Sequence, residues 1–546
     1  MPALSNEADR YQQMIDREVV KALGAIPLLV PILENLGLRD IIGRYLVSVN
    51  DVDNGTVALA LCLNRLLAPK PLYKVETWLA DTVLPEYLGL DAGKLHDDRL
   101  GRFLDDLEPH LDTIWQDLCL RALIRYQVDL SVILYDLTSF YFEGDYAANP
   151  AITYGYSRDH RPDTKQRVVA LNVTGQDGVP VLYSLLAGNT ADCTTPEANL
   201  SRLRGFLNNL PAPPPWPLLV CDRALIKQEM LVRGFGQEVH LLGPLDDRLE
   251  EYRALLRRVP TAELREHPLA YRPKRAKPDD PVPYYGILRP FTFQAEIADQ
   301  TLSVPGQVLV VLSESKERLD QTHRQAELDK LEQGLAGIAA KLNQRQYKRR
   351  EYVLGRIEQV QRGNKAKRLV DVELVGEDGA LELRYAVNEE KLAQAQALDG
   401  KYLLATTQGK LTADEMLQRS KLRDGVEKRI ELFKGPLRVR PIYLRTEGRI
   451  KGLVFLTLVA LLAFSLLELK LRRANQPQTA RAVLEGFQSL RAFYLLFRDG
   501  SSVRRVGEAS AFQTRLLHLL GLPPPQAYLN VSCKGATDSN QATCGK

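Results

Sequence analysis

Apolar residues recur at helical spacing along the first part of the chain, which predicts helices up to about residue 125. The expected helices cover residues 26–45, 57–67, 72–79 and 100–123, and few β-branched runs interrupt them. Asn54-Gly55 and Pro69-Lys70-Pro71 are turn signals between them. We therefore expect an all-helical N-terminal domain over residues 1–127, for which a role in recognition and a purely structural role are equally open.

The pattern changes after residue 128 to short apolar runs that predict strands. Residues 131–136 form the first run, which ends at Asp136. Residues 167–174 and 179–186 flank the turn Gln176-Asp177-Gly178 and predict a hairpin. A helix over 196–210 and a proline-rich connector precede a buried strand, 218–221, that ends at Asp222. This order is expected of a ribonuclease-H-like α/β core, whose first part would be residues 128–242.

Residues 243–409 predict a long insertion into that core. Strands are expected at 284–294 and 307–312, and a hairpin at 369–375 and 380–387 around Gly376 to Gly379. Between them a heptad-like seam predicts a helix, and a second apolar series predicts its partner in a helical hairpin arm. The two series are Leu328, Leu331, Leu335, Ile338 and Leu342, then Val353, Ile357 and Val360.

The core is expected to resume over residues 410–522, after a strand at 402–406. Thr412-x-x-Glu415 is a capping box that would open the helix carrying Glu427, and further helices follow it. The uncharged segment 452–467 stops short of the roughly 18 to 20 apolar residues of a membrane helix. We therefore expect a core helix there, although a membrane anchor is the rival interpretation. The polar tail, 523–546, is expected to be disordered.

Composition agrees with a folded protein of several domains and sets limits on its chemistry. The 546 residues are 45% hydrophobic and 26% charged, with a net charge of +4. Any nucleic-acid surface must therefore come from local clusters of basic residues. The six cysteines form no CxxC pair and have no nearby histidines, which favours reduced thiols over zinc ligands or disulfides. The polar N-terminus is not a signal peptide.

Three carboxylates stand out as candidate metal ligands. Asp136 and Asp222 each follow four or five apolar residues, which would place both at one edge of a sheet. Oxygen ligands suit Mg²⁺ or Mn²⁺, and two such ions promote in-line displacement at a phosphodiester. Glu427 shares a predicted helix face with Arg423 and Lys434, at spacings of four and seven. Glu431 is an equal candidate by geometry, and an exposed salt-bridged helix face is the simpler alternative.

Several motifs together resemble the bacterial insertion-sequence DDE transposases of the Tyr-Arg-Glu-Lys signature branch, the IS-four-like superfamily. Glu427 with Phe433-Lys434, Leu437-x-Val439-Arg440-Pro441 and Arg449-Ile450 is similar to that family's last catalytic segment. The blocks 135–139 and 221–223 are similar to its two aspartate strands, and 155–166 and 188–192 are also typical of it. The resemblance covers about residues 20–475.

The resemblance implies a DNA transposase that cleaves at element ends and joins the freed 3′-hydroxyl to target DNA. It implies that Asp136, Asp222 and Glu427 hold the metals, two Mg²⁺ or Mn²⁺ ions, and it selects Glu427 over Glu431. Arg423 and Lys434, with Arg438 and Arg440 from the cation-rich segment 420–451, would contact DNA.

The expected partners are element ends, target DNA and a second copy in a synaptic dimer, with no membrane and no small-molecule substrate. The expected location is the bacterial cytoplasm, at the nucleoid. Lys348, Arg349 and Arg350 form a second basic patch, which a solvated helix face explains equally well. His160 is expected to bond within its loop rather than reach the active site.

Two departures from the family pattern keep an alternative open. Ser420 stands where the signature tyrosine is expected, and Trp78, Trp115 and Trp216 all precede the insertion, where relatives that form hairpin DNA ends keep a base-stacking tryptophan. Tyr284, Tyr285 or Phe291 would have to replace it. Gly425 weakens the catalytic helix. The alternative is a decayed or co-opted transposase that binds DNA without cutting it.

Overall fold

The computed structural model describes residues 14–48, 50–191, 194–273, 283–440 and 442–530. The chain divides into two compact units. The discontinuous unit comprises Met1–Pro215 and Arg423–Lys546, and the inserted unit is Trp216–Leu422. The chain therefore begins one unit, builds the other and then returns to finish the first.

The N-terminal part of the discontinuous unit is mainly helical. The expected helix at 26–45 is divided into α2 (Ile26–Asn35) and α3 (Leu38–Tyr45) by Gly37, whose φ of 66° is a conformation that favours glycine. Short 3₁₀ turns similarly divide the expected helices at 72–79 and 100–123. The remaining helices here are α4 (Asn54–Leu67), α5 (Val75–Ala80), α6 (Leu84–Leu88), α7 (Asp97–Leu107) and α8 (Leu111–Tyr126).

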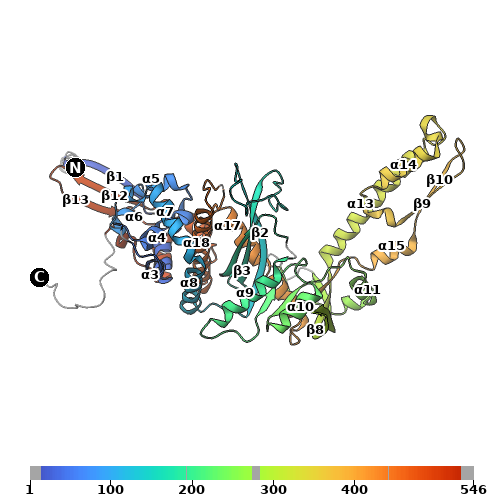
Figure 1. Ribbon diagram of the computed structural model, residues 1–546, viewed down its shortest axis with the longest axis horizontal. Helices are drawn as coiled ribbons and strands as arrows, with labels where there is room; N and C mark the ends of the chain where they lie inside the picture. Colours follow the sequence, from blue (N-terminus) through green and yellow to red (C-terminus); the bar gives the residue numbers. More distant parts are fainter. Residues whose placement is uncertain (1–13, 49, 192–193, 274–282, 441, 531–546) are drawn as a thin grey trace, which may run out of the picture. The chain divides into compact units, whose positions relative to one another are not determined.

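The apolar segment predicted as a core helix forms the middle of α18 (Glu447–Arg473). By length and composition α18 could cross a membrane, but 94% of its most apolar 18-residue window is buried inside the protein. Helices α2, α4, α7 and α8 pack against it (Figure 1). A helix that is apolar on every side needs neighbours on every side, and these four helices supply a large part of that cover.

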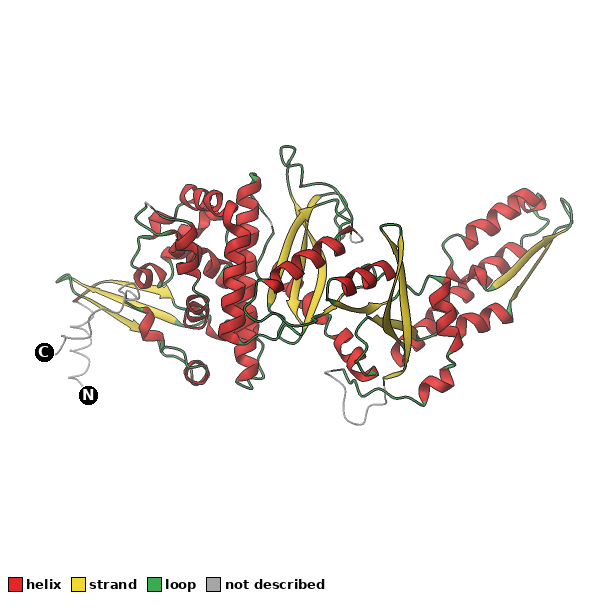
Figure 2. Cartoon of the chain, turned by 60° about the horizontal axis from the view of Figure 1, so that its bottom comes forward, coloured by secondary structure: helices red, strands yellow, loops and turns green. Residues whose placement is uncertain are grey.

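A three-stranded antiparallel sheet corrects the expectation of an all-helical N-terminal domain and an all-helical C-terminal end. Strand β1 (Ile15–Ala22) pairs with β12 (Arg491–Phe497), which also pairs with β13 (Ser502–Val506). Figure 2 shows these strands in yellow near the labelled N-terminus. Two further helices lie on either side of β12 and β13 in the sequence, α19 (Ala480–Phe487) and α20 (Ala511–Leu519).

A second antiparallel sheet in the discontinuous unit has the order β2-β3-β4. Strand β2 (Val132–Phe142) pairs with β3 (Lys165–Thr174), and β3 with β4 (Pro180–Ala187), so the predicted hairpin is confirmed. Gly178 in its turn has a φ of 62°. Helix α9 (Pro196–Asn208) follows β4 in the sequence, as predicted. Helix α17 (Asp424–Lys434) follows the inserted unit.

The inserted unit contains a mixed sheet with the order β5-β6-β11-β8-β7. Only β5 and β6 are parallel, and the other neighbours are antiparallel. The strands are β5 (Leu218–Val220), β6 (His240–Pro244), β7 (Tyr284–Ile297), β8 (Gln300–Ser313) and β11 (Lys401–Thr406). The accompanying helices are α10 (Gln228–Gly236), α11 (Glu250–Arg258), α12 (Thr261–Arg265) and α16 (Ala413–Lys421).

The predicted helical arm is confirmed within the inserted unit. Helices α13 (Glu314–Ala339) and α14 (Arg350–Gln361) lie side by side, beside the hairpin of β9 (Val370–Val375) and β10 (Glu382–Val387) (Figure 1). The predicted seam of α13 is buried in one cluster with Val353 and Ile357 of α14. Helix α15 (Glu389–Gln396) leads from the hairpin back to β11.

Candidate active site and nucleic-acid interface

Asp136 lies in the middle of β2 and not at its end as predicted, because the strand continues to Phe142. Its side chain is partly buried, and its Oδ1 accepts a hydrogen bond from the Leu137 N–H at 2.8 Å. Side chains alternate along a strand, so Leu134, Asp136 and Phe140 share one face of β2. What covers that face therefore decides what can reach Asp136.

Helix α17 packs on this face of β2. Near its start, Gly425 approaches Leu134 so closely that an added Cβ would lie 3.0 Å from Leu134 Cδ1. Near its end, the rings of Phe433 and Phe140 meet almost edge to face, with centroids 6.3 Å apart. Two contacts on the same strand face thus fix the direction of α17 along β2.

Asp136 and Glu427 both lie between those two contacts, the first along β2 and the second along α17. The packing therefore brings together the two elements that carry them. Glu427 is in the first turn of α17 with its side chain 51% exposed, and Arg423 reaches its Oε1 at 3.1 Å. Glu431 is exposed as well, so exposure does not separate the two glutamates.

The capping box opens a different helix from the one that was predicted. Thr412 and Glu415 cap α16, which ends at Lys421, and α17 starts afresh at Asp424 with Arg423 as its N-cap residue. The expectation of one helix running from the capping box through Glu427 was therefore wrong. Ser420, in the place of the signature tyrosine, donates its hydroxyl to the Leu417 carbonyl at 2.7 Å.

Asp222 follows the end of β5 by two residues, as the sequence predicted. Its Oδ1 accepts the Arg223 N–H at 2.7 Å, and its carbonyl accepts the Leu225 N–H, so the residue opens a turn. The Arg223 guanidinium lies 2.9 Å from Asp247. Asp222 belongs to the inserted unit, whereas Asp136 and Glu427 belong to the discontinuous unit. The complete trio therefore stays a prediction.

Two of the predicted DNA-binding cations share one acidic partner. Lys434 and Arg440 lie 2.8 and 2.7 Å from the two oxygens of Asp159, and the Arg440 guanidinium stands 4.6 Å from the centroid of the Tyr141 ring. Burial lowers the pKa of the Lys434 ammonium, and Asp159 counteracts part of this effect. Arg438 is exposed, and its φ of 47° turns the backbone between them.

Three other cations of segment 420–451 are paired with carboxylates of the protein, and one of them, Arg429, is buried. Arg429 is buried and pairs with Glu468, while its Nε donates to the Gly178 carbonyl at 2.7 Å. Arg449 pairs with Asp105 at 2.8 Å, and Lys451 with Glu108 at 2.8 Å. The count of charges in the sequence therefore overstates the charge offered to DNA.

The other basic and polar candidates have mainly local contacts. In the arm patch, Arg350 donates to the Gly376 carbonyl at 2.9 Å, and its N–H donates to Asp378. His160 is exposed with a φ of 56°, and its backbone N–H donates to the Ser157 carbonyl at 3.3 Å. Asp192, Pro441 and part of the basic stretch 267–283 lie outside the described residues.

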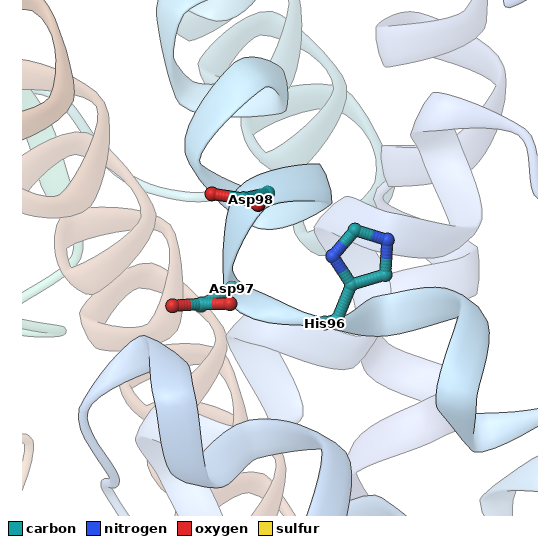
Figure 3. Close-up of side chains that lie close together, drawn as sticks. All are labelled: His96, Asp97 and Asp98. Atoms are coloured by element: carbon teal, nitrogen blue, oxygen red, sulfur yellow. The ribbon is translucent and has the colours of Figure 1, made fainter.

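The described part of the chain contains one group of three close metal-type side chains, His96, Asp97 and Asp98, at the start of α7 (Figure 3). All three are exposed. His96 Nδ1 accepts the Arg99 N–H at 3.4 Å, and acidic residues in a first turn stabilise a helix N-terminus. Helix capping accounts for this group, which the sequence motifs did not single out.

The aromatic residues proposed to replace the missing tryptophan are already in contact with other groups. Tyr284 packs against Tyr271 with Lys421 over its ring, and Arg265 lies over the Tyr285 ring. Phe291 packs against Phe293 at 4.9 Å. The exposed tyrosines are Tyr73, Tyr154, Tyr156, Tyr352 and Tyr443 among the residues that the structure describes. Sequence alone could not separate exposed from packed rings.

Cysteine chemistry does not enter this site. Cys62, Cys119 and Cys221 are buried, and burial raises the pKa of the Cys62 and Cys119 thiols well above the ordinary value. The other cysteines, Cys193, Cys533 and Cys544, lie outside the described residues.

Comparison with known proteins finds one matching family model and one similar solved structure that can be named. Residues 18–118 match a family described as a domain of unknown function, DUF4277. No curated protein matches. Among solved structures, the chain is similar to a piggyBac transposase, from a synaptic complex with hairpin DNA, at 7% identity and a TM-score of 0.40. That similarity covers 84% of this chain and 79% of the other.

Proposed function

We propose that this protein is a metal-dependent DNA transposase of the DDE type. The observation that carries the proposal is the packing of α17 on the face of β2 that holds Asp136, which brings the Glu427 helix to that strand. The sequence motifs supply the rest, because they surround these carboxylates and Asp222 in the order typical of bacterial insertion-sequence transposases. The proposed catalytic core is ribonuclease-H-like, with the inserted unit interrupting it.

Asp136, Asp222 and Glu427 would hold Mg²⁺ or Mn²⁺. They offer oxygen donors only, which fits hard divalent cations. When bound, a pair of such ions activates the attacking hydroxyl and stabilises the leaving oxygen. The N–H groups of Leu137 and Arg223 fix the carboxylates of the two aspartates. Arg423 would have to release Glu427 for metal binding, and a DNA phosphate is a suitable new partner for its guanidinium.

DNA is the proposed partner, both as element ends and as target. Lys434, Arg438, Arg440 and Arg423 would contact the phosphate backbone, which positions DNA without reading its sequence. Two ends brought together would require at least two copies of the chain, so a dimer in the synaptic complex belongs to the proposal. The proposed setting is the bacterial nucleoid.

The test is cleavage of supercoiled DNA that carries the flanking ends of the protein's own gene, with and without Mg²⁺. Asp136→Asn, Asp222→Asn and Glu427→Gln should each lower cleavage by at least about a hundredfold, because each removes a metal ligand, while DNA binding persists. Glu431→Gln is the matched control, one turn further along α17 and also exposed. Cleavage at wild-type rate by Glu427→Gln, or its loss in Glu431→Gln, would contradict the assignment of Glu427.

The second candidate is a decayed or co-opted transposase that only binds DNA. Ser420 favours it, because the signature tyrosine is absent. Gly425 does not favour it, since its close approach to Leu134 gives a packing reason for glycine within α17. Metal-independent DNA binding with no cleavage of any end sequence would support this second candidate.

A further inference from the structure

Asp159 lies between two predicted DNA-binding cations, Lys434 and Arg440. It lies in the loop between β2 and β3, and each of its carboxylate oxygens has its own partner, Lys434 at 2.8 Å and Arg440 at 2.7 Å. The side chains of Asp159, Lys434 and Arg440 are 10%, 13% and 26% exposed. A DNA phosphate therefore cannot reach both cations while Asp159 stays between them.

The arrangement has the chemistry of an anion site. The two oxygens of the Asp159 carboxylate each bind one cation. The two free oxygens of a phosphodiester can be bound by two cations in the same way. Tyr141 supports the site, because the guanidinium groups of Arg440 and Arg161 lie 4.6 and 5.0 Å from its ring centroid. One carboxylate shared by two cations leaves one positive charge in excess, so the site still attracts an anion.

The turn that carries Asp159 has contacts of its own and a few side-chain contacts to β2 and β3, including Arg161 over the Tyr141 ring and the Gln166 Nε2 bond to the Tyr156 carbonyl at 3.0 Å. The Arg161 N–H donates to Ser157 Oγ at 3.0 Å, and the His160 N–H donates to the Ser157 carbonyl at 3.3 Å. One bond to β2 is made by the Arg158 N–H, which donates to Ser139 Oγ at 3.2 Å. The turn can thus shift without disturbing the pairing of β2 with β3.

We propose that the Asp159 carboxylate occupies the place of a DNA phosphate on Lys434 and Arg440 in the free protein and is displaced when a phosphodiester binds there. The inference rests on the proposed function, because it takes DNA as the ligand. Asp159 then weakens the binding of DNA, because a DNA phosphate must first displace its carboxylate from Lys434 and Arg440. A purely structural Asp159 would instead stay in place and hold the two cations for DNA.

The test compares Asp159→Asn with Asp163→Asn, which lies in the same loop and makes the same change of charge. Asp163 is exposed and pairs with Arg161 at 2.9 Å, so it controls for the general gain of positive charge. Binding of a duplex of about 30 base pairs is measured by fluorescence anisotropy in EDTA, without cleavage. Asp159→Asn should bind about tenfold more tightly than Asp163→Asn, since no carboxylate competes with the phosphate.

A second measurement needs no substitution. In the wild-type protein, hydrogen exchange of the backbone amides of residues 157–163 should become faster when the duplex binds, because the turn leaves the two cations. This result stands even if Asp159→Asn fails to fold.

Two outcomes would overturn the inference while leaving the proposed function intact. One is equal or weaker DNA binding by a folded Asp159→Asn relative to Asp163→Asn, and the other is slower exchange of residues 157–163 on DNA binding. Failure of the wild-type and both variants to bind the duplex would instead overturn the proposed function, and this inference with it.

Discussion

Helices α18 and α13 are nearly equal in length, at 27 and 26 residues, but they are stabilised in opposite ways. In α18 almost every residue from Ile450 to Leu471 is buried, with helices on all sides. In α13 the buried residues are Leu328, Leu331, Leu335 and Ile338, one stripe along an otherwise exposed helix. The comparison teaches that α18 depends on the whole discontinuous unit, whereas α13 depends on one partner helix and a hairpin.

A buried charge should give the largest difference between the two helices. Ala460→Asp in α18 places an unpaired carboxylate at a fully buried position and should destabilise the discontinuous unit by more than about 4 kcal/mol. Ala336→Asp on the exposed side of α13 should cost less than about 1 kcal/mol. Urea unfolding followed by the fluorescence of Trp115, which packs against Phe455 of α18, measures the first effect. Equal costs would remove the contrast.

A cavity in the arm should destabilise only the arm. Leu335 is fully buried in the cluster of α13 and α14, so Leu335→Ala should cost about 3 kcal/mol there. Hydrogen exchange should become faster in α13 and α14 and stay unchanged in α18. Leu319→Ala, at a 52% exposed position of α13, is the control and should change neither. Faster exchange in α18 would show that the arm and the discontinuous unit unfold together.

Loss of an ion pair should also cost more free energy of unfolding beside α18 than in the arm. Arg429 is buried beside α18 and pairs with Glu468, so Arg429→Met should cost about 2 kcal/mol by leaving the carboxylate and the Gly178 carbonyl without their donor. Arg362 follows α14 and pairs with Glu358 at 3.6 Å, with both side chains more than three-quarters exposed. Arg362→Met should therefore change the free energy of unfolding by less than about 0.5 kcal/mol in the same urea titration.

The smallest expected effect is a loss of stability of the discontinuous unit at acid pH. Burial raises the pKa of Glu447, but hydrogen bonds from Arg167 and Asn149 outweigh it and hold the pKa below the ordinary value. The stabilisation is therefore present above that ordinary value and is lost as the pH falls through the lowered pKa. Glu447→Gln should flatten the fall in melting temperature between pH 5 and pH 3, roughly the range in which carboxylates titrate. Glu263→Gln, at a position of the inserted unit whose side chain is 40% exposed and pairs with Arg289, should leave that fall in melting temperature unchanged.

Local patterns predicted most elements of the fold, and long-range pairing explains the main failure. The hairpin of β3 and β4, the arm helices and the buried α18 each follow from residues close together in sequence. Strand β1 pairs with β12, more than four hundred residues away, and nothing near residues 15–22 signals that partner. The segment also lacks the apolar–polar alternation typical of a strand, because Asp16, Arg17 and Glu18 are consecutive charges and Val19 and Val20 are adjacent.

The candidate site was predicted in its residues but not in its geometry. Asp136 was placed at a strand end because the apolar run before it stops there, yet Phe140 and Phe142 extend the strand by packing against each other and α17. The role of Asp159 could not be predicted, because its two partners lie about 280 residues away. Contacts of this kind depend on tertiary packing, which periodicity does not encode.

The division of one unit by another has a consequence for synthesis on the ribosome. Helices α2, α4, α7 and α8 emerge early, but their common partner α18 follows only after the whole inserted unit. At typical translation rates, synthesis of the inserted unit takes on the order of 10 to 40 s. During that interval the apolar faces of the first helices have no permanent cover, whereas the inserted unit already holds all its own strands. The discontinuous unit is thus the first to start folding and the last to finish.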